Sequence, residues 1–316
     1  MSAPVTAPAP VPPRSASPAL AAAVVAGALV AVQQRLNGEL KTALTDALLT
    51  AVVSFGTGLL AVLAVVLSRP AARAAFGLVR QVPWPQRLGG LGGALLVAVG
   101  AAAAPEIGVA LLTVGLVAGQ TGGGLLVDRL GLGPGGAHAL TLPRIGGAAL
   151  CLVAVGISVL GEGARSADPL LLVLVVLAGL GVAVQQALNG RVRRSTGDAG
   201  VAVLVNFLVG GAALVLGWLV HVAYSGLQVG PWPGPEQWYL YAGGPLGAAF
   251  VAVAALTVRR LGVLRLGLAI ISGQLVGALL LDLTVPVHDQ AVDVLTVVGV
   301  LLTMVAVAIS GRAARP

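Results

Sequence analysis

The amide side chains of Gln33, Asn37, Gln185 and Asn189 are candidates to bind a solute. Each glutamine precedes its asparagine by four positions, so both amides lie on one face of a helix. The surrounding stretches read Val-Gln-Gln-x-Leu-Asn-Gly in both places and end long apolar runs. An amide donates and accepts hydrogen bonds, and without a partner it is costly in apolar surroundings. These amides therefore bind either a polar solute or a neighbouring helix.

Two interpretations of the four amides stay open. In one, they line a central cavity, where Gln33 and Gln185 contact a solute while Asn37 and Asn189 shape the mouth. In the other, they cap helix ends and bond to neighbouring helices. The second interpretation draws on the Asn-Gly pair that closes each stretch, because Asn-Gly is a turn signal.

A second pair of glutamines, Gln120 and Gln274, is followed eight positions later by Asp128 and Asp282 respectively. Both glutamines lie well inside apolar runs, so each should bond to a solute or to another helix. The aspartates fall at the ends of those runs, and we expect interfacial anchors or gate pairs rather than proton carriers. The predicted substrate-binding residues are Gln33, Asn37, Gln120, Gln185, Asn189 and Gln274.

Glycines separated by four positions indicate where helices approach closely, because a glycine face leaves room for a second backbone. Four such pairs occur, and we expect packing rather than binding from all of them. They are Gly89 and Gly93, Gly119 and Gly123, Gly243 and Gly247, and Gly273 and Gly277.

The usual signatures of an enzyme or a metal protein fail here. His138, His221 and His288 are scattered without metal-ligand spacing. The glycines of segment 131–136 match a dinucleotide fingerprint in letters, but no strand precedes them and no acidic residue follows at the right distance. The single cysteine, Cys151, is expected to be a small core residue. We therefore predict no catalytic residues, no metal and no cofactor.

The elements that position these side chains come from an internal duplication. Gln185 follows Gln33 by 152 positions, and Phe207 follows Phe55 by the same interval. The Gly-Gln-x7-Asp stretches repeat with an interval of 154, so the small changes of interval fall in loops. A repeat of this length predicts two structurally equivalent halves.

The composition places both halves in a membrane. The chain is 58% hydrophobic and only 9% charged, whereas a soluble domain carries about 25% charged residues. Its apolar runs lack strict alternation and exceed the roughly 20 residues that a membrane-crossing helix needs. The net charge of +7 does not indicate nucleic acid, because the basic residues lie between apolar spans rather than on one soluble face.

The sequence predicts an all-α membrane protein with ten transmembrane helices, as two inverted five-helix repeats. A disordered tail, 1–18, precedes the first repeat at 19–161 and the second at 168–311. The expected spans of the first repeat are Ala19–Leu36, Leu44–Ser68, Leu88–Ala104, Ile107–Val127 and Leu142–Leu160. Those of the second are Leu170–Leu188, Val201–Val220, Trp238–Leu256, Leu261–Leu281 and Val292–Ser310.

The distribution of basic residues predicts the orientation. On a ten-span arrangement, fifteen of the 18 Lys and Arg residues fall on the side of the two termini. Only Arg35, Lys41 and Arg165 fall on the other side. The positive-inside rule therefore places both termini in the cytoplasm of a bacterial-type inner membrane. Five spans per half mean that the second half enters the membrane from the opposite face.

Two inverted five-helix halves resemble the drug/metabolite transporter superfamily. The paired Gln-Gln-x-Leu-Asn-Gly and Gly-Gln-x7-Asp stretches are similar to those of one branch, the inner-membrane exporters that occur as single five-helix or fused ten-helix proteins. The resemblance covers Ala19 to Ser310. It implies a membrane transporter, and it leaves the cargo open.

The resulting hypothesis is a carrier that moves a small organic solute by alternating access between its halves. The expected partners are the lipid bilayer and that solute, without nucleic acid, and the oligomeric state stays open. One alternative is a membrane scaffold or subunit that acts by helix packing without transport. Another is an intramembrane lipid-modifying enzyme, which needs an acid, base or metal cluster that the sequence does not offer.

Overall fold

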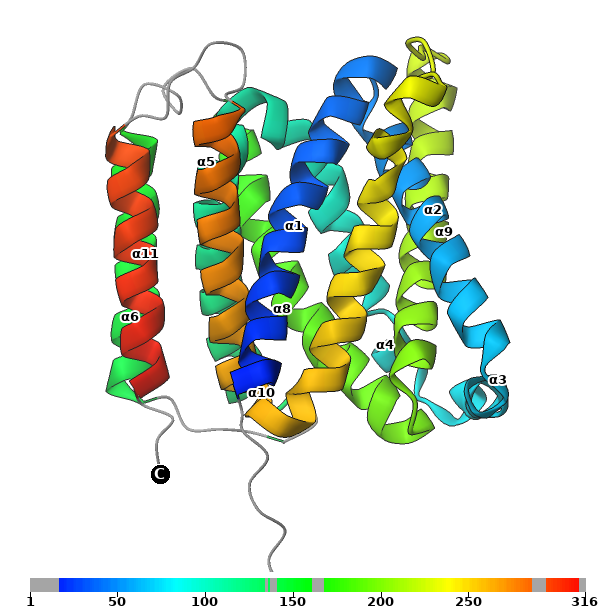
Figure 1. The fold of residues 1–316 in the computed structure, drawn as a ribbon, viewed down its shortest axis with the longest axis horizontal. Coiled ribbons are helices and arrows are strands. Elements are labelled where there is room, and N and C mark those ends of the chain that lie inside the picture. The colour runs from blue at the N-terminus through cyan, green and yellow to red at the C-terminus, as the bar shows by residue number, and fades with distance from the viewer. Residues whose placement is uncertain (1–16, 134–135, 137–140, 161–167, 286–293, 313–316) are drawn as a thin grey trace, which may run out of the picture.

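The computed structural model describes residues 17–133, 136, 141–160, 168–285 and 294–312. Every regular element in these ranges is a helix, and the long helices stand side by side in one bundle (Figure 1). Most of the predicted tail lies outside the described residues, as do His138, His288 and Arg165. The side chain of Cys151 is not described either.

Both halves build the bundle from a similar series of helices. The first contributes α1 (Ser17–Leu44), α2 (Ala47–Ser68), α3 (Pro70–Phe76), η1 (Gly77–Gln81), α4 (Trp84–Arg87), α5 (Gly90–Arg129) and α6 (Leu142–Val159). The second contributes α8 (Pro169–Thr196), α9 (Ala199–Ser225), η2 (Pro235–Ala242), α10 (Gly243–Thr284) and α11 (Val294–Arg312).

The long helices have membrane dimensions. Among the described residues, five helical stretches are long and apolar enough to cross a bilayer: Pro18–Leu44, Ala47–Ser68, Trp84–Arg129, Pro169–Thr196 and Ala199–Ser225. Three shorter apolar helices are Ile145–Ala154, Ala269–Thr284 and Val297–Ala306. The described elements are thus all helical and several have the length and composition to cross a bilayer, while the count of ten spans stays a prediction.

Helix α5 consists of two arms that both pack on α8. Gly108, with φ 75° and ψ 162°, breaks the helix between them. Gly92 in the first arm contacts Gly181 of α8, and Gly123 in the second arm contacts Leu180. A straight helix would separate Gly92 from Gly123 by about 46 Å, so the chain must turn back at the break.

Helix α10 folds back in the same way. Gly247 in its first arm lies against Gln33 of α1, and Gly277 in its second arm lies against Ala28. A straight helix would separate these glycines by about 45 Å. Figure 1 shows the two arms of α10 on opposite sides of α1.

The most extensive helix packing joins one half of the chain to the other. Helix α8 of the second half packs on α5 of the first, and α1 of the first packs on α10 of the second. Repeat-equivalent Phe55 and Phe207 meet with their ring centroids 4.9 Å apart. Helices α1 and α8 run in opposite directions in Figure 1. Equivalent helices of the two halves thus take part in the contacts between them.

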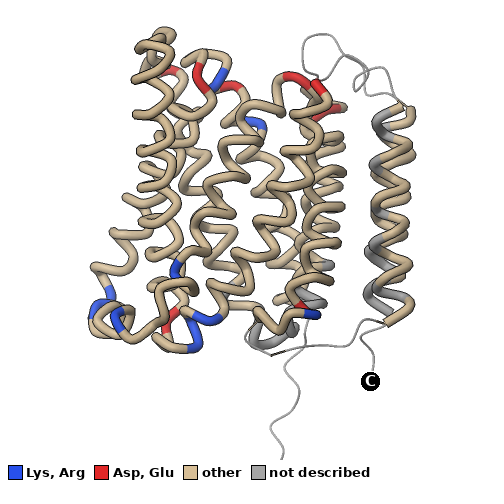
Figure 2. Tube along the Cα trace, turned by 180° about the vertical axis from the view of Figure 1, so that it is seen from behind, with Lys and Arg blue, Asp and Glu red and all other residues tan. Residues whose placement is uncertain are grey.

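Charge distinguishes the two ends of the bundle. At the end where α2 and α8 finish, which we call the basic end, the described cations are Arg69, Arg73, Arg80, Arg87, Arg129, Arg191, Arg193 and Arg194. The opposite end carries most of the Asp and Glu residues (Figure 2). Helix α1 starts and α11 finishes at the basic end (Figure 1).

Two helices are longer than the sequence suggested. We expected spans ending at Leu36 and Leu188, but α1 continues to Leu44 and α8 to Thr196. The Asn-Gly pairs thus lie inside helices, and their interpretation as turns and helix caps is wrong. Packing overrides the local preference, because Gly38 lies closely against α5: a Cβ atom there would be 3.0 Å from Ala104 Cβ and 3.2 Å from Pro105 Cδ.

Candidate functional site

Gln33 and Gln185 face the other half of the protein at equivalent places. A Cβ atom added at Gly247 would lie 2.5 Å from Gln33 Nε2, and one added at Gly93 would lie 3.1 Å from Gln185 Nε2. Both glutamines are buried, with 5% and 7% of their surface exposed. Gln185 Oε1 has no hydrogen-bond partner. The glycines thus let each amide enter the interface between the halves.

Asn37 and Asn189 occupy equivalent positions, but only one of them is paired. Asn189 Nδ2 donates to Oδ1 of Asn206 over 3.0 Å. Ser54 stands at the place equivalent to Asn206, and its shorter side chain does not reach Asn37. Both amide atoms of Asn37 and the Ser54 hydroxyl are buried without a partner. These atoms can bind a water molecule or a polar group of a solute.

The second glutamine of each pair differs even more between the halves, and our sequence analysis did not single it out. Gln34 is fully buried, its amide atoms are unpaired, and it fits only because Gly100 of α5 has no side chain. Its equivalent, Gln186, is exposed. Helix α1 is therefore closed against α5 near the opposite end, whereas α8 leaves Gln186 accessible near the basic end.

Asp282 of α10 bonds to α5 at the end opposite the basic end. Its Oδ2 accepts a hydrogen bond of 2.6 Å from the backbone N–H of Ala110. It thereby caps the second arm of α5 just after the Gly108 break. We expected Asp282 to be an interfacial anchor or gate, yet only 7% of it is exposed. Nearby, Arg35 pairs with Glu39 over 2.8 Å and Lys41 with Glu106 over 3.3 Å.

The comparisons with known proteins decide the family. The sequence profile of the family described as "Putative inner membrane exporter, YdcZ" matches this chain twice, over residues 18–157 and 170–309. The chain belongs to this exporter family. Among curated proteins, none matches the chain.

A solved structure shares the fold of this family member. Its title reads "Crystal structure of protein", and it is 22% identical to the chain. The similarity extends over 95% of this chain and 97% of that one, with a TM-score of 0.57. At this identity the likeness shows a common architecture, and it carries no information about cargo.

The other predicted residues of this exporter-family chain lie on the folded-back arms. Gln120 is partly buried and Gln274 is 2% exposed. The backbone N–H of Gln120 lies opposite Gly179, and that of Gln274 lies opposite Gly27. Both are thus placed where a second arm crosses α8 or α1. Their role in binding stays a prediction.

The Gly-x3-Gly pairs lie at the same crossings. Side chains added at Gly119 and Gly273 would collide with the carbonyls of Val176 and Val24 respectively. Gly123 and Gly277 follow one turn later against Leu180 and Ala28. Gly89 and Gly243 face Asn189 and Asn37. These glycines let the helices that carry the amides approach the other half.

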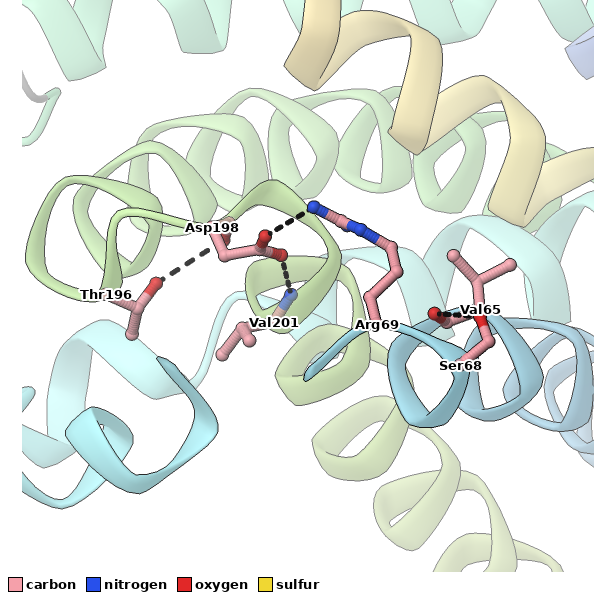
Figure 3. A network of polar contacts seen from close by, with 6 residues as sticks. All are labelled: Val65, Ser68, Arg69, Thr196, Asp198 and Val201. Carbon is pink, nitrogen blue, oxygen red and sulfur yellow. Dashed lines mark hydrogen bonds and ion pairs between the residues drawn. The ribbon is translucent and has the colours of Figure 1, made fainter. Parts of the chain in front are cut away.

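Polar contacts at the basic end connect the two halves. Arg69 Nη2 lies 3.0 Å from Oδ2 of Asp198, and Asp198 Oδ1 caps α9 at the Val201 N–H (Figure 3). Asp128, the repeat equivalent of Asp282, also lies near this end and is partly buried.

Within the described residues, no three His, Cys, Asp or Glu residues form a metal-binding group.

Proposed function

We propose that the protein carries a small polar organic solute across the membrane by alternating access between its two inverted halves, in ten membrane passages. One observation carries this proposal. Repeat-equivalent Gln34 and Gln186 have opposite environments, one fully buried and one exposed. A carrier that is closed at one end requires this asymmetry, because its two halves share a local sequence but must pack differently.

Contacts between helices at the end opposite the basic end support a state that is closed there. Three contacts join α1 or α10 to α5 there: Gln34 against Gly100, Gly38 against Pro105, and Asp282 against the Ala110 N–H. In the alternative state, α8 closes on α10, and Gln186 meets Ala254 as Gln34 now meets Gly100. With the termini in the cytoplasm, the closed end faces outward and the accessible end faces inward.

The chemistry of the interface favours an uncharged cargo. Gln33, Asn37 and Gln185 offer amides between the halves, and several of their atoms are unpaired. Asp282 and Arg35 are engaged in the closed end rather than in the centre. Amides recognise hydroxyl, amide and carbonyl groups by hydrogen bonds, so a neutral solute with several such groups fits best.

Labelling of single cysteines tests the alternating access. The one native cysteine is replaced in Cys151→Ser, and Gln34→Cys or Gln186→Cys is added. We expect a membrane-impermeant maleimide to label position 186 from the cytoplasmic side and to leave position 34 unlabelled from both sides. Added cargo should reverse this pattern, so that position 34 becomes labelled and position 186 becomes protected. Equal labelling of both positions under all conditions would contradict the proposal.

Flux measurements test the cargo site. The purified protein is reconstituted into vesicles and screened with panels of neutral, cationic and anionic solutes. Once a transported solute is found, Gln33→Leu and Gln185→Leu should abolish its flux, whereas Gln81→Leu, a change of an exposed glutamine in η1, should not. A folded protein that moves no solute in any panel would favour a scaffold instead.

A further inference from the structure

A basic pocket lies at the end of α8. It has a volume of about 300 Å³ and is lined by Gln86 of α4, by Arg191, Arg194 and Ser195 of α8, and by Gly133 and Gly136. None of these residues is acidic. Arg191 donates one of its five N–H groups to the Gly131 carbonyl over 2.6 Å, which leaves four donors on this guanidinium.

Beside the pocket, residues 70–87 form an elbow of α3, η1 and α4 between α2 and α5. Figure 1 shows α3 end-on, so its axis lies across the bundle, parallel to the membrane surface. Helix α4 and η1 both contact α8. Through Gln86, the elbow also supplies part of the pocket wall.

The elbow is basic and apolar at once. It carries Arg73, Arg80 and Arg87 and no acidic residue. Arg87 donates to the Val82 and Arg80 carbonyls, which orders the elbow and leaves its positive charge without a counter-ion there. Phe76 is 41% exposed and Trp84 is 70% exposed. Such a surface fits the boundary between lipid headgroups and acyl chains.

The matching surface at the opposite end differs. Its η2 segment carries Glu236 and no basic residue, although Trp238 and Tyr239 are exposed there. Both ends thus present interfacial aromatic residues, but only the basic end adds arginines to them. The carbonyl end of α8 carries about half a negative charge, which the full positive charge of Arg191 outweighs.

We propose that the pocket at Gln86, Arg191, Arg194 and Ser195 binds the headgroup phosphate of an anionic phospholipid, whose acyl chains lie along the elbow. Arginine guanidiniums form charge-assisted, bidentate hydrogen bonds with phosphate. Basic pockets at the cytoplasmic side of membrane helices bind such headgroups. The exposed Phe76 and Trp84 favour a lipid over a soluble anion.

Thermal unfolding in a neutral detergent tests the site. Phosphatidylglycerol should raise the melting temperature of the wild-type protein, and phosphatidylcholine should not. Combined Arg191→Gln and Arg194→Gln substitutions should weaken the phosphatidylglycerol effect about thirty-fold in lipid concentration. Arg69→Gln removes one charge at the same end without touching the pocket, so the lipid effect should persist in that variant.

Two further measurements keep the test decisive. If the double variant does not fold, the wild-type effect of phosphatidylglycerol should still weaken from 50 to 500 mM salt, which screens exposed charges at about these ionic strengths. Equal stabilisation by both lipids, or an unchanged effect in the double variant, would overturn the proposal. Equal stabilisation by glycerol phosphate alone would assign the pocket to a soluble anion and also overturn it.

Discussion

The carboxylate of Asp282 caps a helix that belongs to the other half of the chain. Its Oδ2 lies 2.6 Å from the backbone nitrogen of Ala110, and the capped arm starts at Gly108, whose φ is 75°. An N-cap residue normally precedes its own helix. Here the cap comes from α10 because the break at Gly108 brings the new helix start against it. The end of the bundle opposite the basic end therefore depends on a contact between the halves.

Loss of this cap should loosen the closed end. Asp282→Ala should lower the free energy of unfolding by about 1 kcal/mol, the usual worth of an N-cap. It should also let maleimide reach a cysteine at position 34 from the outer side. As a matched control, Asp168→Ala removes the cap of α8 within its own half, and it should leave position 34 unlabelled. Labelling in neither variant would show that Asp282 is not needed for closure.

Gly108 should tolerate no side chain. With φ 75° and ψ 162°, its conformation is essentially restricted to glycine. A Cβ atom there would also lie 2.9 Å from Asp282 Oδ2. Gly108→Ala should therefore destabilise the protein by about 2 kcal/mol, measured by thermal or denaturant unfolding. Gly124→Ala, in the same helix with open space around it, should be neutral or stabilising. Similar values for both would contradict the backbone argument.

Ser54→Asn should repair the unpaired Asn37. It would recreate the bond that Asn189 makes to Asn206 over 3.0 Å. Satisfying buried amide atoms should stabilise the protein by about 1 kcal/mol, seen as a higher melting temperature. The reverse change, Asn206→Ser, should lower stability by a similar amount. A lower melting temperature for Ser54→Asn would mean that a bound water already satisfies Asn37.

The glycines at the helix crossings should be needed because they are small. A side chain at Gly119 would collide with the Val176 carbonyl, so Gly119→Ala should separate α5 from α8. We expect a loss of about 2 kcal/mol or more, as in overpacked cores. Gly122→Ala changes the same helix at an exposed position with nothing within 4 Å. Equal stability of the two variants would remove this crossing from the packing account.

The limits of sequence-based prediction follow from particular residues. The repeated Gln-Gln-x-Leu-Asn-Gly and Gly-Gln-x7-Asp stretches indicated the family, and the two-fold match of the family profile confirmed it. The helix ends were wrong at Leu36 and Leu188, because Asn-Gly is a turn signal only where packing does not hold it in a helix. The role of Asp282 as a cap could not be predicted either, since Ala110 lies 172 positions away.

By itself, the sequence determined the membrane class and the duplicated architecture, because composition and repetition are properties of the chain that no packing can change. Only the tertiary structure decided which copy of each repeated amide is buried. Gln34 and Gln186 have the same local sequence on their N-terminal side, yet α1 is closed against Gly100 while α8 leaves its glutamine exposed. Identical local preferences cannot distinguish two such states, because the difference lies in contacts between helices far apart in the chain.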